Sequence, residues 1–291
     1  MTAVLRAQGL GKRYRRRWAL SECTLEIPAG RVVGLVGPNG AGKTTLLSLA
    51  AGLLAPTAGT IEVCGGRPAG GRAQLAKVGF VAQDTPTYAR LTVAEHLELG
   101  ARLSPGWDDT LARARIERLG LAPGRRAGNL SGGQRAQLAL TLAIAKRPEL
   151  LILDEPVASL DPLARREFLR DLSDATAGRE LSVVHSSHLV SDVERVCDYL
   201  IVLVASRVRV AGDVTGLLAT HHLLTAPRLD PDALPAGVEV VSAHRTDRQT
   251  TMLVRADTAP DGPAWTVGPV GLEDLVLAYM SMSASALEVH P

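Results

Sequence analysis

The run Gly-Pro-Asn-Gly-Ala-Gly-Lys-Thr-Thr at residues 37–45 has the residue types and spacing of a phosphate-binding loop, G-x-x-x-x-G-K-[ST]. Its glycines would let the backbone curl until successive N–H groups point at a phosphate, at the positive end of a helix that begins near Lys43. Lys43 would reach the β- and γ-phosphates of a nucleotide, and the Thr44 hydroxyl would ligate Mg²⁺ between them. The predicted phosphate-binding residues are Gly37, Pro38, Asn39, Gly40, Ala41, Gly42, Lys43, Thr44 and Thr45.

An acidic pair is the second candidate for chemistry. The apolar run Leu150–Leu153 ends in Asp154 and Glu155. At the end of a buried strand, Asp154 could hold Mg²⁺ through water, and Glu155 could polarise a water for attack on a γ-phosphate. The same pattern also fits a solvated turn or a helix cap, so the pair alone leaves both interpretations open.

The elements that must position these residues read as alternating strands and helices. Arg31–Gly37 is a short, nearly all-apolar run that predicts a strand buried on both faces. Leucines at 46, 47, 49 and 53 then recur at helical spacing. Further strand-like runs are Val78–Ala82, Leu150–Leu153, Leu181–Val184 and Tyr199–Val204. This alternation predicts an α/β domain with a mainly parallel sheet.

A helical insertion interrupts this alternation. Between Leu91 and Arg147 there is no strand signal, and amphipathic stretches dominate instead. These stretches are Val93–Leu103, Thr110–Leu119 and Gln134–Lys146. We expect a helical subdomain over about residues 86–147, within a domain that covers residues 1–219.

The amino-acid composition changes in the last 72 residues, 220–291, and predicts a small α+β accessory domain there. A linker comes first, and two strand-like runs and a helix follow it. The linker residues are Pro227, Pro231, Pro235 and Gly237, the runs are Val238–Ser242 and Thr250–Val254, and the helix is Leu272–Met282. This helix could dock a partner or pack on its own accessory strands.

Composition limits the classes of function. The 291 residues are 46% hydrophobic and 21% charged, which is typical of a globular protein with a sizeable core. Aromatic residues are 3%, and 32 Lys and Arg balance 30 Asp and Glu, so we expect no nucleic-acid partner. Cys23, Cys64 and Cys197 stand far apart, which excludes a disulfide framework and a zinc ribbon and favours a reducing cytosol.

A pentapeptide ahead of the acidic pair resolves the alternatives. The chain carries Leu130-Ser131-Gly132-Gly133-Gln134, and on this motif it resembles the ATP-binding cassette (ABC) family. Four further elements fall in the family's order. They are Tyr14, which looks like the aromatic that stacks on adenine, Gln83, which looks like the Q-loop, Ser159-Leu160-Asp161, which looks like the D-loop, and His188, which looks like the switch histidine. The resemblance covers roughly Val4 to Thr220.

The resemblance implies a P-loop NTPase fold: a RecA-like core with a mainly parallel sheet, an antiparallel N-terminal β region and the inserted helical subdomain. It implies ATP and Mg²⁺ as cofactors and ATP hydrolysis as the activity. The implied catalytic residues are Lys43, Gln83, Glu155 and His188, the metal ligands are Thr44, Gln83 and Asp154, and the residues that contact nucleotide include Tyr14, Ser131, Gly132, Gly133, Gln134 and Asp161. The segment from Ser131 would face ATP held by a second protomer, so the family implies a head-to-tail homodimer.

The partners implied by the resemblance are separately encoded transmembrane permease subunits. The family places a groove for their coupling helix near Pro86, Tyr88 and Leu91. The longest uncharged run, Thr44–Ile61, contains glycines and a proline and is a poor membrane span, so we expect a peripheral protein on the cytoplasmic face of the membrane. The pattern Leu272-Glu273-Asp274-Leu275 resembles the tail of ABC-2 type export ATPases. The alternative is a non-transport ABC ATPase that acts on a soluble or ribosomal partner.

Three smaller ambiguities follow from the sequence. Trp18 could supply the adenine platform in place of Tyr14. His185 and His188 could form a metal pair, although no third ligand is evident, or His185 could be a histidine at a strand end. The basic run Lys12–Arg17 could touch lipid headgroups or RNA, or form a solvated hairpin.

Overall fold

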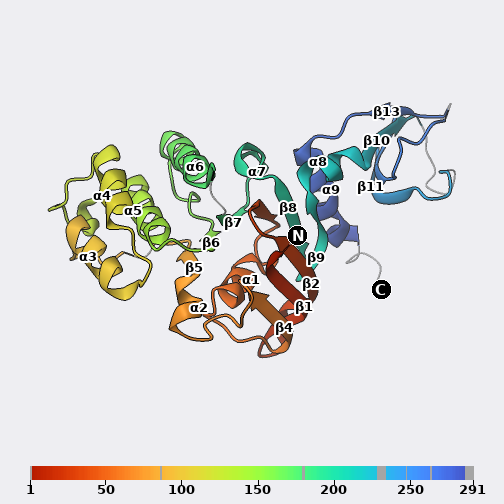
Figure 1. The fold of residues 1–291 in the computed structure, drawn as a ribbon. Coiled ribbons are helices and arrows are strands. Elements are labelled where there is room, and N and C mark those ends of the chain that lie inside the picture. The colour runs from red at the N-terminus through yellow and green to blue at the C-terminus, as the bar shows by residue number, and fades with distance from the viewer. Residues whose placement is uncertain are drawn as a thin grey trace.

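The computed structural model describes residues 2–85, 87–178, 181–227, 234–246, 248–262 and 264–285. A helical region lies at one end, two sheets form the middle, and a small sheet lies at the other end (Figure 1). Pro86 and Pro231, which the sequence singled out, fall outside the described residues.

The central sheet has the strand order β5-β6-β7-β3-β8-β9. Its first five strands run parallel, and β9 is antiparallel to β8. The strands are β3 (Val32–Val36), β5 (Val78–Val81), β6 (Leu150–Asp154), β7 (Ser182–Ser187), β8 (Tyr199–Val204) and β9 (Arg207–Asp213). β6 and β7 are buried along their whole length, as expected for strands covered on both faces. The predicted α/β class is confirmed.

The N-terminal strands form a second, antiparallel sheet with the strand order β2-β1-β4. Its strands are β1 (Ala3–Tyr14), β2 (Arg17–Pro28) and β4 (Ala58–Val63). The basic run is the tip of the β1–β2 hairpin, where Tyr14 pairs with Arg17 and Arg15 has a positive φ of 52°. The run is therefore an exposed hairpin, one of the two arrangements that the sequence left open.

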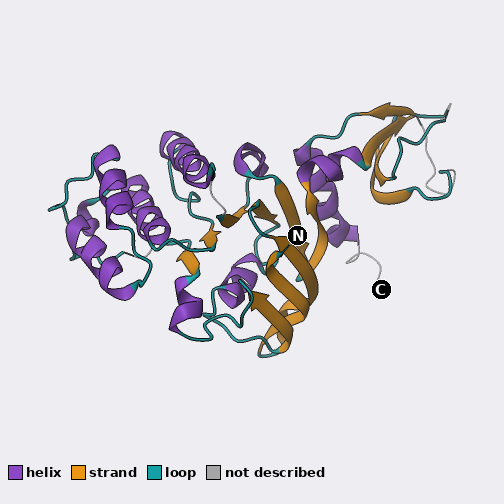
Figure 2. Cartoon of the chain, viewed as in Figure 1, coloured by secondary structure: helices purple, strands orange, loops and turns teal. Residues whose placement is uncertain are grey.

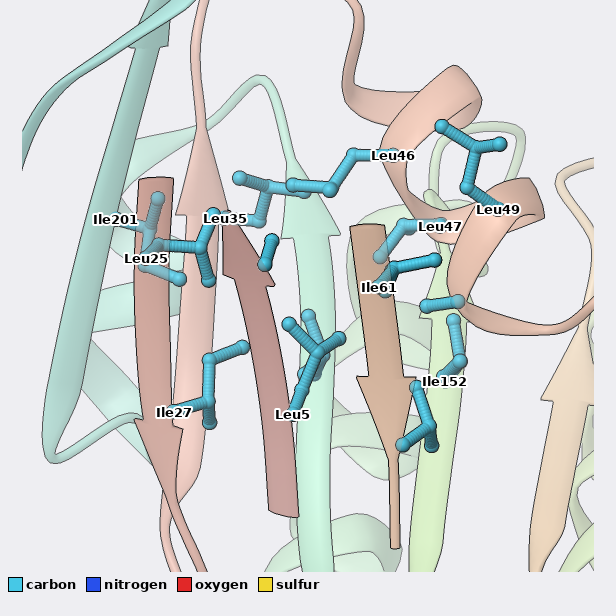
Figure 3. Packing of buried hydrophobic residues seen from close by; sticks show 14 of the residues in the cluster. Leu5, Leu25, Ile27, Leu35, Leu46, Leu47, Leu49, Ile61, Ile152 and Ile201 are labelled. Carbon is cyan, nitrogen blue, oxygen red and sulfur yellow. The ribbon is translucent and has the colours of Figure 1, made fainter. Parts of the chain in front are cut away.

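The helix after the phosphate-binding loop, α1 (Lys43–Ala50), packs between these two sheets. Leu46, Leu47 and Leu49 share one buried cluster with Leu5, Ile61 and Ile152, and Figure 3 shows Leu47 beside Ile61. The leucine spacing predicted a helix that continues to Leu53, but α1 ends at Ala50. Gly52 adopts a positive φ of 75°, and Leu53 is 63% exposed.

The segment between β5 and β6 is drawn in Figure 2 as helices and loops over its described residues. Its helices are α3 (Val93–Leu103), α4 (Asp109–Arg118), η1 (Ala127–Asn129) and α5 (Gly132–Ala145). Three of them begin at a side-chain cap: Thr92 and Glu95 form a capping box on α3, Asp108 caps α4, and Ser131 and Gln134 form a capping box on α5. Outside this segment, the helices before the C-terminal sheet are α1 and also α2 (Arg72–Ala76), α6 (Pro162–Thr176), α7 (Val190–Val196) and α8 (Val214–Ala219).

The C-terminal sheet has the order β11-β12-β10-β13 and is antiparallel throughout. Its strands are β10 (His221–Ala226), β11 (Glu239–Arg245), β12 (Thr250–Arg255) and β13 (Thr266–Gly268). The two predicted strands correspond to β11 and β12, whereas β10 and β13 were not predicted. Their short, mixed polar and apolar sequences become strands through pairing with β12 and with each other.

The last helix, α9 (Leu272–Ser285), packs on two parts of the molecule at once. It contacts β11 of the C-terminal sheet, and it also contacts β8 and α7 beside the central sheet. Leu275, Val276 and Tyr279 share a buried cluster with Val193 and Leu200. The sequence led us to expect this helix either on its own strands or free for a partner, and its contact with the central sheet was not anticipated. None of the helices within the described residues is long and apolar enough to traverse a lipid bilayer.

Candidate functional site

The loop 37–42 joins the end of β3 to the start of α1, as the sequence predicted. Gly40 and Gly42 have positive φ values of 79° and 108°. A Cβ atom on Gly42 would lie 2.3 Å from the Ala19 carbonyl oxygen, and one on Gly37 would lie 2.1 Å from that of Leu203. Glycine is therefore required at Gly37 by close packing, and at Gly42 by both packing and conformation.

A cavity of about 650 Å³ opens over this loop. Residues from five separate segments line it. Four of these segments follow the parallel strands β3, β5, β6 and β7, which all end at the same edge of the sheet, and the fifth is the β1–β2 hairpin. Its lining includes Tyr14, Trp18, Asn39, Gly40, Gly42, Lys43, Thr44, Thr45, Gln83, Glu155 and His188. The structure thus brings most of the predicted nucleotide-binding and catalytic residues together in one place.

A chain of charged contacts runs through the cavity. The Lys43 ammonium donates to the carbonyl oxygens of Gly37 at 2.8 Å and Pro38 at 3.4 Å, and lies 3.3 Å from Glu155 Oε1. Glu155 Oε2 lies 3.2 Å from His188 Nδ1. Lys43 is 5% exposed and Glu155 12%, so this cation and carboxylate lie in a poorly solvated place where charge interactions are strong.

The acidic pair is held by a residue that the sequence analysis missed. Ser186 Oγ donates to Asp154 Oδ1 at 2.9 Å and accepts a hydrogen bond of 2.9 Å from the Glu155 amide. Ser186 lies directly opposite Asp154 in the β6–β7 register. A signal was present, since the serines at 186 and 187 are polar residues in a strand that is buried throughout and ends just before His188.

The oxygen atoms near Asp154 fit a hard divalent cation. Asp154 is 2% exposed, and burial raises its pKa, while hydrogen bonds from the Ser186 and Thr44 hydroxyls act in the opposite direction. A carboxylate with this desolvation cost would be stabilised by a nearby cation. Thr44 and Gln83 both line the cavity over Lys43. Mg²⁺ accepts the ligand types present here, which are the Thr44 hydroxyl, the Asp154 carboxylate and the Gln83 side-chain amide.

Both aromatic side chains at the hairpin tip line the cavity, and both are partly exposed. The Lys12 ammonium lies 5.6 Å from the centre of the Tyr14 ring, and the Arg13 guanidinium lies 5.4 Å from that of Trp18. Each ring has one cation beside it and an exposed portion available for stacking. Tyr14 and Trp18 therefore both stay candidates for the adenine platform.

The predicted signature residues lie elsewhere in the chain. Ser131 and Gln134 form a capping box on α5, in which the Gln134 backbone N–H donates to Ser131 Oγ at 3.2 Å and Gln134 Oε1 accepts from the Ser131 backbone N–H at 3.1 Å. Ser131, Gly133 and Gln134 line a separate cavity of about 500 Å³. Asp161 caps α6 and accepts from the amides of Leu163 and Ala164. Among the described residues of one chain, neither the signature residues nor Asp161 belongs to the lining of the cavity over Lys43.

His185 lies in the middle of the central sheet, between β3 and β6. It is fully buried, neither ring nitrogen has a hydrogen-bond partner within the described part of the chain, and burial lowers its pKa to about 4. No group of three His, Cys, Asp or Glu side chains that could hold a metal ion occurs among the described residues. His185 is a strand residue, but it lies inside β7 and not at the strand end that the sequence suggested, because β7 continues to Ser187. The alternative of a metal pair with His188 finds no support in the part of the chain described.

Comparisons with known proteins agree with this geometry. Residues 20–158 match the family model described as ABC transporter. The chain is 34% identical over 220 residues to an uncharacterized ABC transporter ATP-binding protein, YxlF, from Bacillus subtilis (strain 168), covering 74% of this chain and 72% of the relative.

Two further similarities are of the same kind. The chain is 35% identical over 243 residues to the phosphonates import ATP-binding protein PhnC 1 of Rhodopseudomonas palustris (strain HaA2), covering 76% of this chain and 85% of the relative. A solved structure of an ATP-binding subunit of an ABC transporter superposes with a TM-score of 0.65 at 28% identity, covering 74% of this chain and 91% of that one. With its phosphate-binding loop, acidic pair and strand order, the chain belongs to the ABC transporter family and is an ATP-binding subunit of the ABC ATPase class.

Proposed function

We propose that this chain binds MgATP in the cavity over residues 37–45 and hydrolyses it with Lys43, Gln83, Glu155 and His188. The observation that carries the proposal is the convergence of Lys43, Glu155 and His188 in one cavity, linked by contacts of 3.3 and 3.2 Å. A buried ammonium beside the loop amides suits the β- and γ-phosphates. Tyr14 or Trp18 would stack on the adenine.

Glu155 is the group placed to act on water. Its carboxylate would accept a hydrogen bond from a water that attacks the γ-phosphorus in line, as the bond from that phosphorus to the bridging oxygen of ADP breaks. Ser186 fixes the Glu155 backbone, which has a positive φ of 45°. His188, in contact with Glu155, would donate a hydrogen bond to the developing charge on the γ-phosphate. Mg²⁺, held by Thr44, Asp154 and Gln83, would neutralise charge on the phosphate oxygens.

The active form that we propose is a head-to-tail homodimer. Ser131 caps α5, which begins at Gly132. Ser131 and the backbone amides of Gly132 and Gly133, together with the helix dipole, would form a second anion-binding position. Because they lie outside the cavity over Lys43, they would complete that site only in a second copy of the chain. Gln134 and Asp161 would lie at the same interface.

The work of the ATPase, in this proposal, is transport through separately encoded transmembrane permease subunits, with the chain on the cytoplasmic face of the membrane. We propose export rather than import, because the C-terminal pattern from Leu272 to Leu275 resembles that of ABC-2 type export ATPases. One of the relatives named above is an import subunit, so overall similarity does not choose the direction. No similarity described above favours the alternative of a non-transport ABC ATPase.

The proposal is tested with Glu155→Gln, which keeps the shape of the side chain and removes its charge. The variant should bind ATP about as tightly as the wild type and hydrolyse it slower by a factor of about 10² or more, because water is no longer polarised. Since ATP then persists, the dimer should accumulate in gel filtration with MgATP. Glu149→Gln makes the same substitution in an exposed ion pair with Lys77, away from this cavity, and is the matched control that should hydrolyse ATP at the wild-type rate. Hydrolysis by Glu155→Gln at the wild-type rate would refute the assignment of Glu155.

A further inference from the structure

The loop that carries His188 is fastened to the helix that follows it. Ser187 Oγ donates to Asp192 Oδ2 at 3.1 Å, and the Leu189 amide donates to the same Ser187 oxygen at 3.0 Å. These contacts lie on both sides of His188. Asp192 is on α7, is 4% exposed, and does not line the cavity over Lys43 as the described residues form it.

Through Arg165, the Asp192 carboxylate is also linked to the segment that carries Glu155. Arg165, on α6, has its Nε atom 4.0 Å from Asp192 Oδ2, and its Nη2 atom donates to the Val157 carbonyl at 3.2 Å. Val157 is 2% exposed and lies two residues after Glu155. The Arg165 Nε atom is itself buried and makes no hydrogen bond within the described residues, so the negative charge that faces it comes from Asp192.

From these contacts we propose that Arg165 and Asp192 are positioning residues that hold the His188 loop against the Glu155 loop. Together they form a continuous link from Val157 to Ser187, and this link sets the 3.2 Å contact between His188 and Glu155. The inference rests on the proposed function, in which Glu155 and His188 both take part in ATP hydrolysis. Without the link, the hydrogen bonds of Ser186 would still join the ends of β6 and β7, but the segments at Val157 and Ser187 would lose their common anchor. A displacement of about 1 Å in a catalytic group can cost about 10²-fold in rate.

The competing explanation is that Arg165 and Asp192 form an ordinary buried ion pair that only stabilises the fold. The chain offers a matched pair to measure that effect. Asp171, also on α6 and 6% exposed, lies 3.5 Å from Arg118 of α4. That ion pair, in which Arg118 is half exposed and Asp171 is buried, joins α6 to α4 and leaves out the segments that carry Glu155 and His188. Its removal therefore reports the cost of changing a buried, ion-paired carboxylate on the same helix.

The test is a set of hydrolysis rates in two backgrounds. Asp192→Ala and Arg165→Met should each lower kcat about 10-fold with little change in KM for ATP. In a His188→Ala background, the same substitutions should lower kcat less than about twofold, because the side chain that they position is gone. Asp171→Asn should have the same proportional effect in both backgrounds. Asp192→Asn, which can still accept from Ser187, should fall between the wild type and Asp192→Ala.

Two results separate the possible failures. An equal proportional loss for Asp192→Ala with and without His188 would overturn the inference while leaving the proposed function intact. Full hydrolysis by His188→Ala would remove His188 from the proposed function, and the link to it would fail as well.

A second measurement does not depend on any residual activity. Because the Leu189 amide donates to an oxygen that Asp192 holds in place, its hydrogen exchange in the full-length protein should speed up about tenfold in Asp192→Ala. The Val184 amide, within β7, should exchange at its wild-type rate and serves as the internal control. Unchanged exchange at Leu189 would overturn the inference.

Discussion

Mixing two inactive variants tests whether each ATP site is shared between chains. Lys43→Ala removes the buried ammonium from one half of the proposed site, and Ser131→Arg places a bulky cation at the start of α5, in the other half. In a mixed dimer, one site carries both changes and the other carries neither. Two proteins that are inactive alone should therefore regain hydrolysis when they are combined.

The expected recovery follows from the symmetry of the dimer. Equal amounts of two chains that pair at random give about half of the dimers as mixed species, and each mixed dimer keeps one intact site of two. The rate per chain should then be about one quarter of the wild-type rate if the sites turn over independently. Plotted against the mixing ratio, the rate should be zero at both ends and highest at equal amounts.

Stability is the main confounding factor, because Ser131 also caps a helix. Losing an N-cap costs about 1 kcal/mol, which a marginal domain would register as a lower Tm. Thr92→Arg breaks the equivalent capping box on α3 and supplies the matched control for that loss. Measured alone, Thr92→Arg should lower Tm by a similar amount and keep most of its hydrolysis, whereas Ser131→Arg should lose hydrolysis.

A flat and inactive mixing curve would argue for strict coupling of the two sites or for a site built within one chain. A double variant with both substitutions, mixed with wild-type chains, distinguishes these. A site within one chain leaves the wild-type chains at full rate, which would refute the shared site. Strict coupling lowers their rate in proportion to the mixed dimers.

The other predictions concern single side chains. Lys43→Ala should abolish ATP turnover and leave the far-ultraviolet circular dichroism unchanged, because Lys43 contacts only its own loop and Glu155 among the described contacts; near-normal hydrolysis would refute the loop assignment. His185 has a folded pKa of about 4, below its unfolded value of 6.5, so the unfolded chain binds more protons between these values and stability is lost as pH falls. Urea unfolding should show His185 contributing about 2 kcal/mol of destabilisation from pH 7 to pH 5, and His185→Leu should lose that part of the pH dependence. An unchanged slope would show that folding does not lower the pKa of the His185 ring.

Local sequence was enough to predict the features that depend on neighbouring residues. The phosphate-binding loop is contiguous, and its glycines take the conformations and close contacts that the motif demands, as at Gly42. Helix starts are encoded by caps such as Thr92 and Ser131. The buried strands β6 and β8 are encoded by nearly unbroken apolar runs, because both faces of a covered sheet exclude water, whereas the polar second half of β7 was not predicted as strand. The order of the motifs from Tyr14 to His188 along the chain is sufficient to indicate the family.

Tertiary structure decided which of these elements meet. The chain order of the strands is not their order in the sheet, so only the arrangement β5-β6-β7-β3 brings Gln83, Glu155 and His188 to the loop of Lys43. The same long-range pairing sets Ser186 opposite Asp154, makes β10 and β13 into strands, and lays α9 against both β8 and the C-terminal sheet. Periodicity and caps report the local backbone, whereas strand order and helix docking depend on which distant apolar surfaces bury each other, and a local pattern does not carry that information.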